Sequence, residues 1–104
     1  MVYFFFYNHL MDEALIRKLS NDYFIQNGSI NIEYFDKTKD KLFIGNQSLV
    51  LDGKLVSFHS SSLDFILKKI DLIPDIKYKN RWEYILEEID VQTQKEKIRA
   101  YIIY

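Results

Sequence analysis

The stretch VYFFFY (2–7) runs directly into the corner NHLM (8–11). An uninterrupted run of aromatic and β-branched residues is typical of a β-strand that is buried on both faces. Asp12 then occupies the N-cap position of an amphipathic segment whose leucines share one face. The stretch therefore predicts a buried central strand at 2–6, a corner, and a helix at about 13–20. The corner is either an ordinary turn or a ligand-binding loop held at the end of the strand.

The composition predicts one soluble, cytoplasmic domain over residues 1–104. The chain is 48% hydrophobic and 16% aromatic, which is enough for a single core. Its net charge of −1 gives no support to a nucleic-acid partner. The absence of cysteine excludes disulfides, thiolate catalysis and cysteine-held metals, and two histidines are too few for a histidine-rich metal site. We expect no cofactor and no membrane partner, because VYFFFY is too short to cross a bilayer and lacks the basic flank of a signal peptide. The oligomeric state is left open.

The rest of the chain predicts several strands, a second helix and two final strands. Asn27-Gly28 indicates a turn between two strands, and Asp52-Gly53 indicates either a hairpin or a bulge. The serines at 60–62 precede LDFILKKI, whose apolar residues share a helical face. Residues 78–90 and 96–104 have the pattern of two long strands. The order predicts an α+β fold with a small mixed, mainly antiparallel, barrel-like sheet and about two flanking helices.

Several motifs, in order and at matching spacings, resemble the gamma-glutamylcyclotransferase-like family, which includes the plant avirulence-induced proteins. The corner Tyr7-Asn8-His9-Leu10 resembles the family's Tyr-Gly-Ser/Thr loop after its first strand, and LVLDGKLVSF (49–58) resembles a later glycine-containing strand. Asp71 precedes Tyr78-Lys79 at the spacing of the family's Asp and Tyr-Arg. RAYIIY (99–104) resembles the closing strand, with the family's late tyrosine falling near Ile103.

The resemblance implies an intramolecular acyl transfer. In the family, the α-amine of a γ-glutamyl group attacks its own side-chain amide carbonyl, which gives 5-oxoproline and releases an amine. A glutamate takes the proton from the attacking ammonium, and the loop after the first strand holds the γ-glutamyl group largely through backbone groups. Backbone N–H groups at a strand–helix junction suit an anion or oxyanion. The resemblance thus implies a pocket between loops 7–10 and 71–78, with these ligand-binding residues: Tyr7, Asn8, His9, Leu10 and Tyr78.

The chain departs from the family at the positions that carry the chemistry. Pro74 stands three residues after Asp71, where the family has its glutamate, and proline can neither accept nor donate a proton. Asn8 replaces the loop glycine, and His9 replaces a small serine or threonine. The two candidate catalytic bases that remain near the implied pocket are Asp75 and His9.

Three functions stay open on the sequence alone. The leading hypothesis is a catalytically impaired family member that binds a small γ-glutamyl-like or anionic metabolite, or a protein partner. The second is an active cyclotransferase, releasing 5-oxoproline, whose base has moved to Asp75 or His9. The third is a non-enzymatic interaction domain whose pocket is filled by its own side chains.

Overall fold

The structure is a computed structural model that describes residues 1–7, 12–36, 41–45, 48–71 and 86–103. Its elements in chain order are β1 (Val2–Phe6), α1 (Glu13–Leu19), β2 (Tyr23–Ile32), β3 (Tyr34–Asp36), β4 (Lys41–Phe43), β5 (Leu49–Phe58), α2 (Leu63–Asp71), β6 (Leu86–Gln92) and β7 (Lys97–Ile103).

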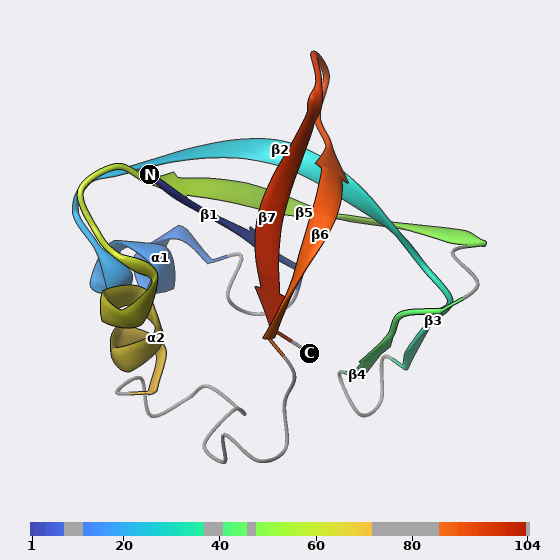
Figure 1. The fold of residues 1–104 in the computed structure, drawn as a ribbon, viewed down its shortest axis with the longest axis horizontal. Helices are drawn as coiled ribbons and strands as arrows, with labels where there is room; N and C mark the ends of the chain where they lie inside the picture. Colours follow the sequence, from blue (N-terminus) through green and yellow to red (C-terminus); the bar gives the residue numbers. More distant parts are fainter. Residues whose placement is uncertain (8–11, 37–40, 46–47, 72–85, 104) are drawn as a thin grey trace.

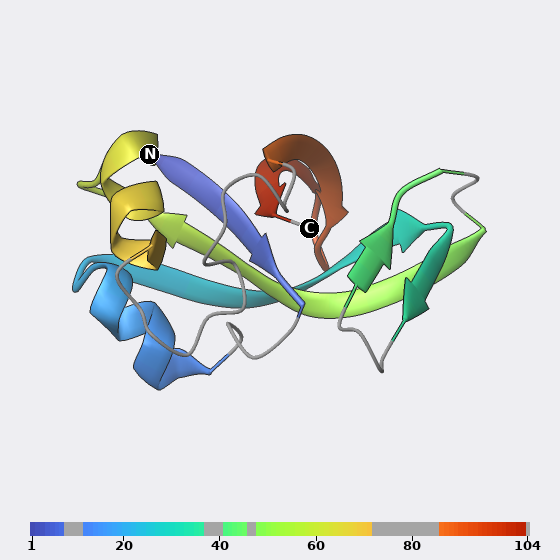
Figure 2. The same ribbon diagram turned by 90° about the horizontal axis from the view of Figure 1, so that it is seen from below.

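Five of these strands close a barrel (Figure 1). The order around it is β1, β5, β2, β6 and β7, and β7 returns to lie beside β1. The pairing of β1 with β7 is parallel, and the other neighbouring pairs are antiparallel. Figure 2 shows the two helices at one end of the barrel and the β3–β4 ribbon at the opposite end. The predicted α+β class is confirmed, and the predicted mixed, barrel-like sheet is a closed barrel.

β1 is buried on both faces, as its continuous apolar sequence predicts. Phe4, Phe5 and Phe6 are each no more than 3% exposed. Successive side chains on a strand point to opposite faces of the sheet. Phe4 and Phe6 therefore join the hydrophobic cluster that contains the buried residues of both helices, whereas Phe5 joins a second cluster with residues of β2, β5, β6 and β7. One short strand thus supplies both cores.

Both helices begin at the caps that the sequence predicts. The Asp12 carboxylate accepts a hydrogen bond from the Ala14 N–H at 2.9 Å, and the Ser62 hydroxyl accepts one from the Phe65 N–H at 3.2 Å. These bonds satisfy backbone donors that have no partner within the helix. The fully buried side chains of the helices that face the barrel are Ile16, Leu19, Ile66 and Ile70.

The hairpin between β6 and β7 is tied by Thr93. Its hydroxyl accepts hydrogen bonds from the N–H groups of Lys95 and Glu96, at 3.3 and 3.2 Å, and its own N–H donates to the Glu96 carbonyl at 2.9 Å. The two predicted final strands are therefore present as an antiparallel pair. Residues 78–85 and 104 of those predicted strands lie outside the described residues.

Two predictions drawn from glycine dipeptides are wrong. Asn27-Gly28 is not a turn, and Asp52-Gly53 is neither a hairpin nor a bulge. Each dipeptide lies in the middle of an uninterrupted ten-residue strand, β2 or β5. The two strands pair antiparallel along their whole length in one register, and Gly28 directly opposes Gly53.

The reason is close packing inside the barrel. A Cβ atom on Gly28 would lie 2.6 Å from Cγ1 of Val91. One on Gly53 would lie 2.6 Å from Cζ of Phe5 and would also overlap the carbonyl oxygen of Phe6. Glycine inside a strand often marks such an approach, or a bend in a barrel wall. Here Gly53 leaves room for the Phe5 ring and Gly28 leaves room for the Val91 side chain. Both glycines belong to the long curved β2–β5 ribbon (Figure 1).

Replacement of Gly53 by alanine tests this packing. Overpacking a rigid core typically costs about 1–3 kcal/mol, so we expect Gly53→Ala to lower the free energy of unfolding in urea by that amount. Gly45→Ala is the matched control, because its added methyl meets only the side chain of the exposed Glu33, which can move aside. It should change the stability by less than about 0.5 kcal/mol. Equal effects of the two substitutions would contradict the assignment of Gly53 to a crowded barrel interior.

Candidate functional site

Tyr7 lies at the end of β1 and joins three parts of the chain. Only 6% of its surface is exposed. Its hydroxyl donates a hydrogen bond to the carbonyl oxygen of Ile103 at 3.2 Å, and its ring meets that of Phe35 edge-on, with 5.7 Å between centroids. Tyr7 therefore fixes the end of β1 to the end of β7 and to the β3–β4 ribbon.

Tyr7 is the one predicted site residue within the part of the chain that the structure describes. The sequence predicts it as a ligand-binding residue, and the structure places its hydroxyl against the backbone of β7. The other predicted residues lie outside the described residues: Asn8, His9, Leu10, Pro74, Asp75 and Tyr78. The pocket between loops 7–10 and 71–78 stays a prediction.

The segments from which those loops leave nevertheless contribute to one hydrophobic cluster. Phe6 precedes the first loop, Ile70 precedes the second, and Ile103 falls near the late tyrosine position of the family. All three belong to the same buried cluster. The described residues thus bring the ends of β1, α2 and β7 to one region of the core.

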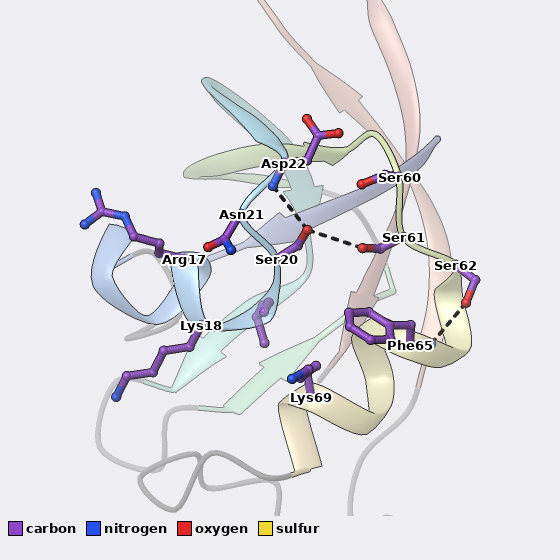
Figure 3. A pocket seen from close by; sticks show the side chains of 11 residues that line it. Arg17, Lys18, Ser20, Asn21, Asp22, Ser60, Ser61, Ser62, Phe65 and Lys69 are labelled. Carbon is purple, nitrogen blue, oxygen red and sulfur yellow. Dashed lines mark hydrogen bonds between the residues drawn. The ribbon is translucent and has the colours of Figure 1, made fainter.

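A depression of about 670 Å³ lies between the end of α1 and the start of α2 (Figure 3). Val2 pairs with Phe58, which His59 separates from the serine run, and this places the depression beside the end of β1 that is opposite to Tyr7. Its lining residues are Arg17, Lys18, Leu19, Ser20, Asn21, Asp22, Ser60, Ser61, Ser62, Phe65 and Lys69.

The serines of this depression bind one another and the backbone. The Ser61 hydroxyl donates to that of Ser20 at 3.2 Å, and the Ser20 hydroxyl also accepts from the Asp22 N–H at 3.3 Å (Figure 3). Ser62 caps α2. These contacts fix the junction between the helices, and they give none of the hydroxyls a base that would make it a nucleophile.

The basic side chains of the depression do not converge on a ligand. Arg17 and Lys18 point away from the serines (Figure 3). Arg17 Nε donates to the Tyr23 hydroxyl at 3.4 Å, and its guanidinium lies 3.8 Å from Glu13. The hydrogen bond that Arg17 donates to the Tyr23 hydroxyl, the charge interaction with Tyr23 and then the charge of Glu13 raise the pKa of Arg17 above its ordinary value. Lys69 Nζ lies 5.4 Å from the centre of the Phe65 ring. The depression is a solvated junction between two helices.

A second depression, of about 660 Å³, lies between the β6–β7 hairpin and the arm. The arm denotes residues 29–32 and 49–52 together with β3 and β4. The sequence predicts Glu87, Glu88 and Asp90 only as solvated residues at a strand end. Their neighbours in the sequence do not indicate that the arm lies opposite them. The lining residues are Ser29, Asn31, Ile44, Val50, Glu87, Glu88, Ile89, Asp90, Gln92, Lys97 and Arg99.

Among the described residues, no three carboxylate or imidazole side chains gather closely enough to hold a metal ion. No helix in the described ranges has the length and apolar character needed to span a membrane.

Comparison with known proteins adds no relative. No family model matches the chain, and no curated protein or solved structure matches it significantly. The functional assignment therefore rests on the residues and their geometry.

Removal of the Tyr7 hydroxyl tests its role at the end of the barrel. Tyr7→Phe leaves the Ile103 carbonyl without this donor, and loss of such a bond costs about 1 kcal/mol. We expect a loss of that size in urea denaturation. The exposed Tyr34 provides the control, and Tyr34→Phe should leave stability within about 0.5 kcal/mol of the wild type. A neutral Tyr7→Phe substitution would show that the hydroxyl does not tie β1 to β7.

Proposed function

We propose that the chain is a gamma-glutamylcyclotransferase-like domain that binds a small γ-glutamyl-like or anionic metabolite in a pocket after β1, with little or no cyclotransferase activity. The observation that carries the proposal is the 3.2 Å hydrogen bond from Tyr7 to Ile103, which joins residues 96 positions apart. This bond supports the proposal because it joins Tyr7 to Ile103, near which the resemblance would put the family's late tyrosine.

Two other features support this function. The motifs of the resemblance follow one another in the family's order along nearly the whole chain. The two segments that lead into the expected loops also contribute to one packed cluster, which contains Phe6 and Ile70 together with Ile103. A rigid core beneath the loops suits a binding site, because a ligand site keeps its geometry only when the surrounding structure is fixed.

The expected lack of turnover follows from the missing proton acceptor. Cyclisation requires the α-ammonium to lose a proton beside the carbonyl that it attacks, and Pro74 offers no acceptor at the family position. The corner after β1 would still offer backbone N–H groups to a carboxylate. Binding without turnover is therefore the outcome that this combination of residues favours.

A pair of isomeric dipeptides tests the binding. The wild-type protein should be stabilised by γ-glutamyl-alanine, by about 2.7 kcal/mol at a concentration one hundred times its Kd. α-Glutamyl-alanine has the same composition and lacks the γ-linkage, so it should give no comparable shift in thermal melting. An equal response to both dipeptides, or to neither, would refute a γ-glutamyl site.

An assay for 5-oxoproline tests the chemistry with the same γ-glutamyl-alanine. The wild type should release no product above background, and Pro74→Glu should introduce weak turnover, because general-base help is worth about 10²–10⁴-fold. Robust turnover by the wild type would contradict the proposal and favour a relocated base. The larger fall in rate between Asp75→Asn and His9→Ala would then identify that base.

A further inference from the structure

The barrel is closed only narrowly between β2 and β6. Among the described residues, the ladder between these strands consists of one pair, Ser29 with Gln92. β2 nevertheless continues to Ile32, and β6 begins at Leu86. The opposite edge of β6 is paired with β7 along its whole length. Within the described ranges, the edge of β6 over residues 86–90 therefore has no strand partner, and such an edge is a template for another strand.

The depression between arm and hairpin opens along this edge. Residues of both sides line it, and three of them, Ile44, Val50 and Ile89, are apolar. Val50 is 67% exposed. A strand added to an open edge gains backbone hydrogen bonds along its length and places alternate side chains against the surface beneath it. The three apolar residues offer a contact surface for one such row of side chains.

The charges along the depression differ between its two ends. Lys97 pairs with Gln92 at the hairpin end, where β2 and β6 meet. Arg99 is held by Asp90 at 3.2 Å and by Glu88 at 3.9 Å. Glu87 lies toward the other end, opposite Ile102, and makes no ion pair with a described residue. The end of the depression near Glu87, away from the Ser29–Gln92 pair, is therefore acidic. Complementary charge between two surfaces is a main determinant of partner choice.

We propose that the second depression, from here on called the groove, binds an extended basic segment of a partner protein. This segment adds as a strand to the edge of β6 at 86–90. Its backbone bonds to that edge, its apolar side chains contact Ile44, Val50 and Ile89, and a lysine or arginine side chain meets Glu87. This interaction surface is separate from the pocket after β1 and does not depend on a γ-glutamyl ligand.

A panel of defined peptides tests the proposal. Fluorescent, acetylated hexapeptides in which valine alternates with lysine, glutamine or glutamate can be titrated against the full chain and followed by anisotropy. The lysine peptide should bind at least about tenfold more tightly than the glutamate peptide, which corresponds to about 1.4 kcal/mol. Its addition should slow the hydrogen exchange of amides in residues 86–90.

Matched charge reversals locate the site. Glu87→Lys should weaken binding of the lysine peptide at least about tenfold and strengthen that of the glutamate peptide. Asp64→Lys makes the same change of charge on the exposed face of α2, outside the groove, and should leave both affinities within about twofold.

Several results would overturn the proposal. One is that none of the three peptides binds, and another is that the lysine and glutamate peptides bind with equal affinity. Equal effects of the two charge reversals, or protection of amides outside the groove, would also contradict it. Protection of residues 86–90 without peptide, together with a concentration-dependent dimer in sedimentation velocity, would show that a second copy of the chain occupies the edge instead.

Discussion

The structure depends on the burial of β1 between β5 and β7. Its phenylalanines alternate between two clusters, so this single strand connects the core beneath the helices with the core inside the barrel. Burial of one such side chain is worth about 1.5–3 kcal/mol. The register of β1 is therefore firmly set, because a slip of one residue would exchange the two cores. The parallel pairing of Phe4 with Tyr101 joins the first strand to the last and makes closure of the barrel a long-range event.

The glycine pair in β2 and β5 links this core to the shape of the surface. Gly28 and Gly53 oppose each other in the ribbon, and an added Cβ atom would crowd Val91 at the first position and the Phe5 ring at the second. The β2–β5 ribbon is curved and continues outward as the arm (Figure 1), while β6 is paired with β7 along its whole length. The same packing that lets Phe5 fill the barrel interior thus accompanies the separation of β2 from β6. The open edge and the groove beside it are consequences of how the barrel closes.

Much of the fold follows from local sequence. The continuous apolar run gives β1, and the capping residues Asp12 and Ser62 mark the starts of both helices. The turn predictions for the two glycine dipeptides were wrong because residues distant in the sequence set their environment. Val91 packs against Gly28, and Phe5 packs against Gly53. Local patterns report the turn preference of a dipeptide and say nothing of a ring packed against it.

The candidate site is less accessible to sequence reasoning. The resemblance implies Tyr7 as a ligand-binding residue, and that role stays a prediction. What the sequence does not indicate is that the Tyr7 hydroxyl bonds to the Ile103 backbone. The second depression gave no sequence signal, because Glu87 and Val50 are distant in the sequence and line one depression only in the folded chain. The resemblance to the cyclotransferase-like family stays a proposal that the dipeptide and 5-oxoproline experiments address.

Native-state hydrogen exchange of the β1 amides tests the central claim most directly. If β1 connects both cores, the amides of Phe4, Phe5 and Phe6 that take part in the barrel ladders should exchange only through global unfolding, with an opening free energy equal to that from urea denaturation. Amides at the ends of the two short helices should open at lower free energies. Exchange of the β1 amides at least about 2 kcal/mol below the global value would contradict the account, because β1 would then detach while the rest of the barrel stays folded.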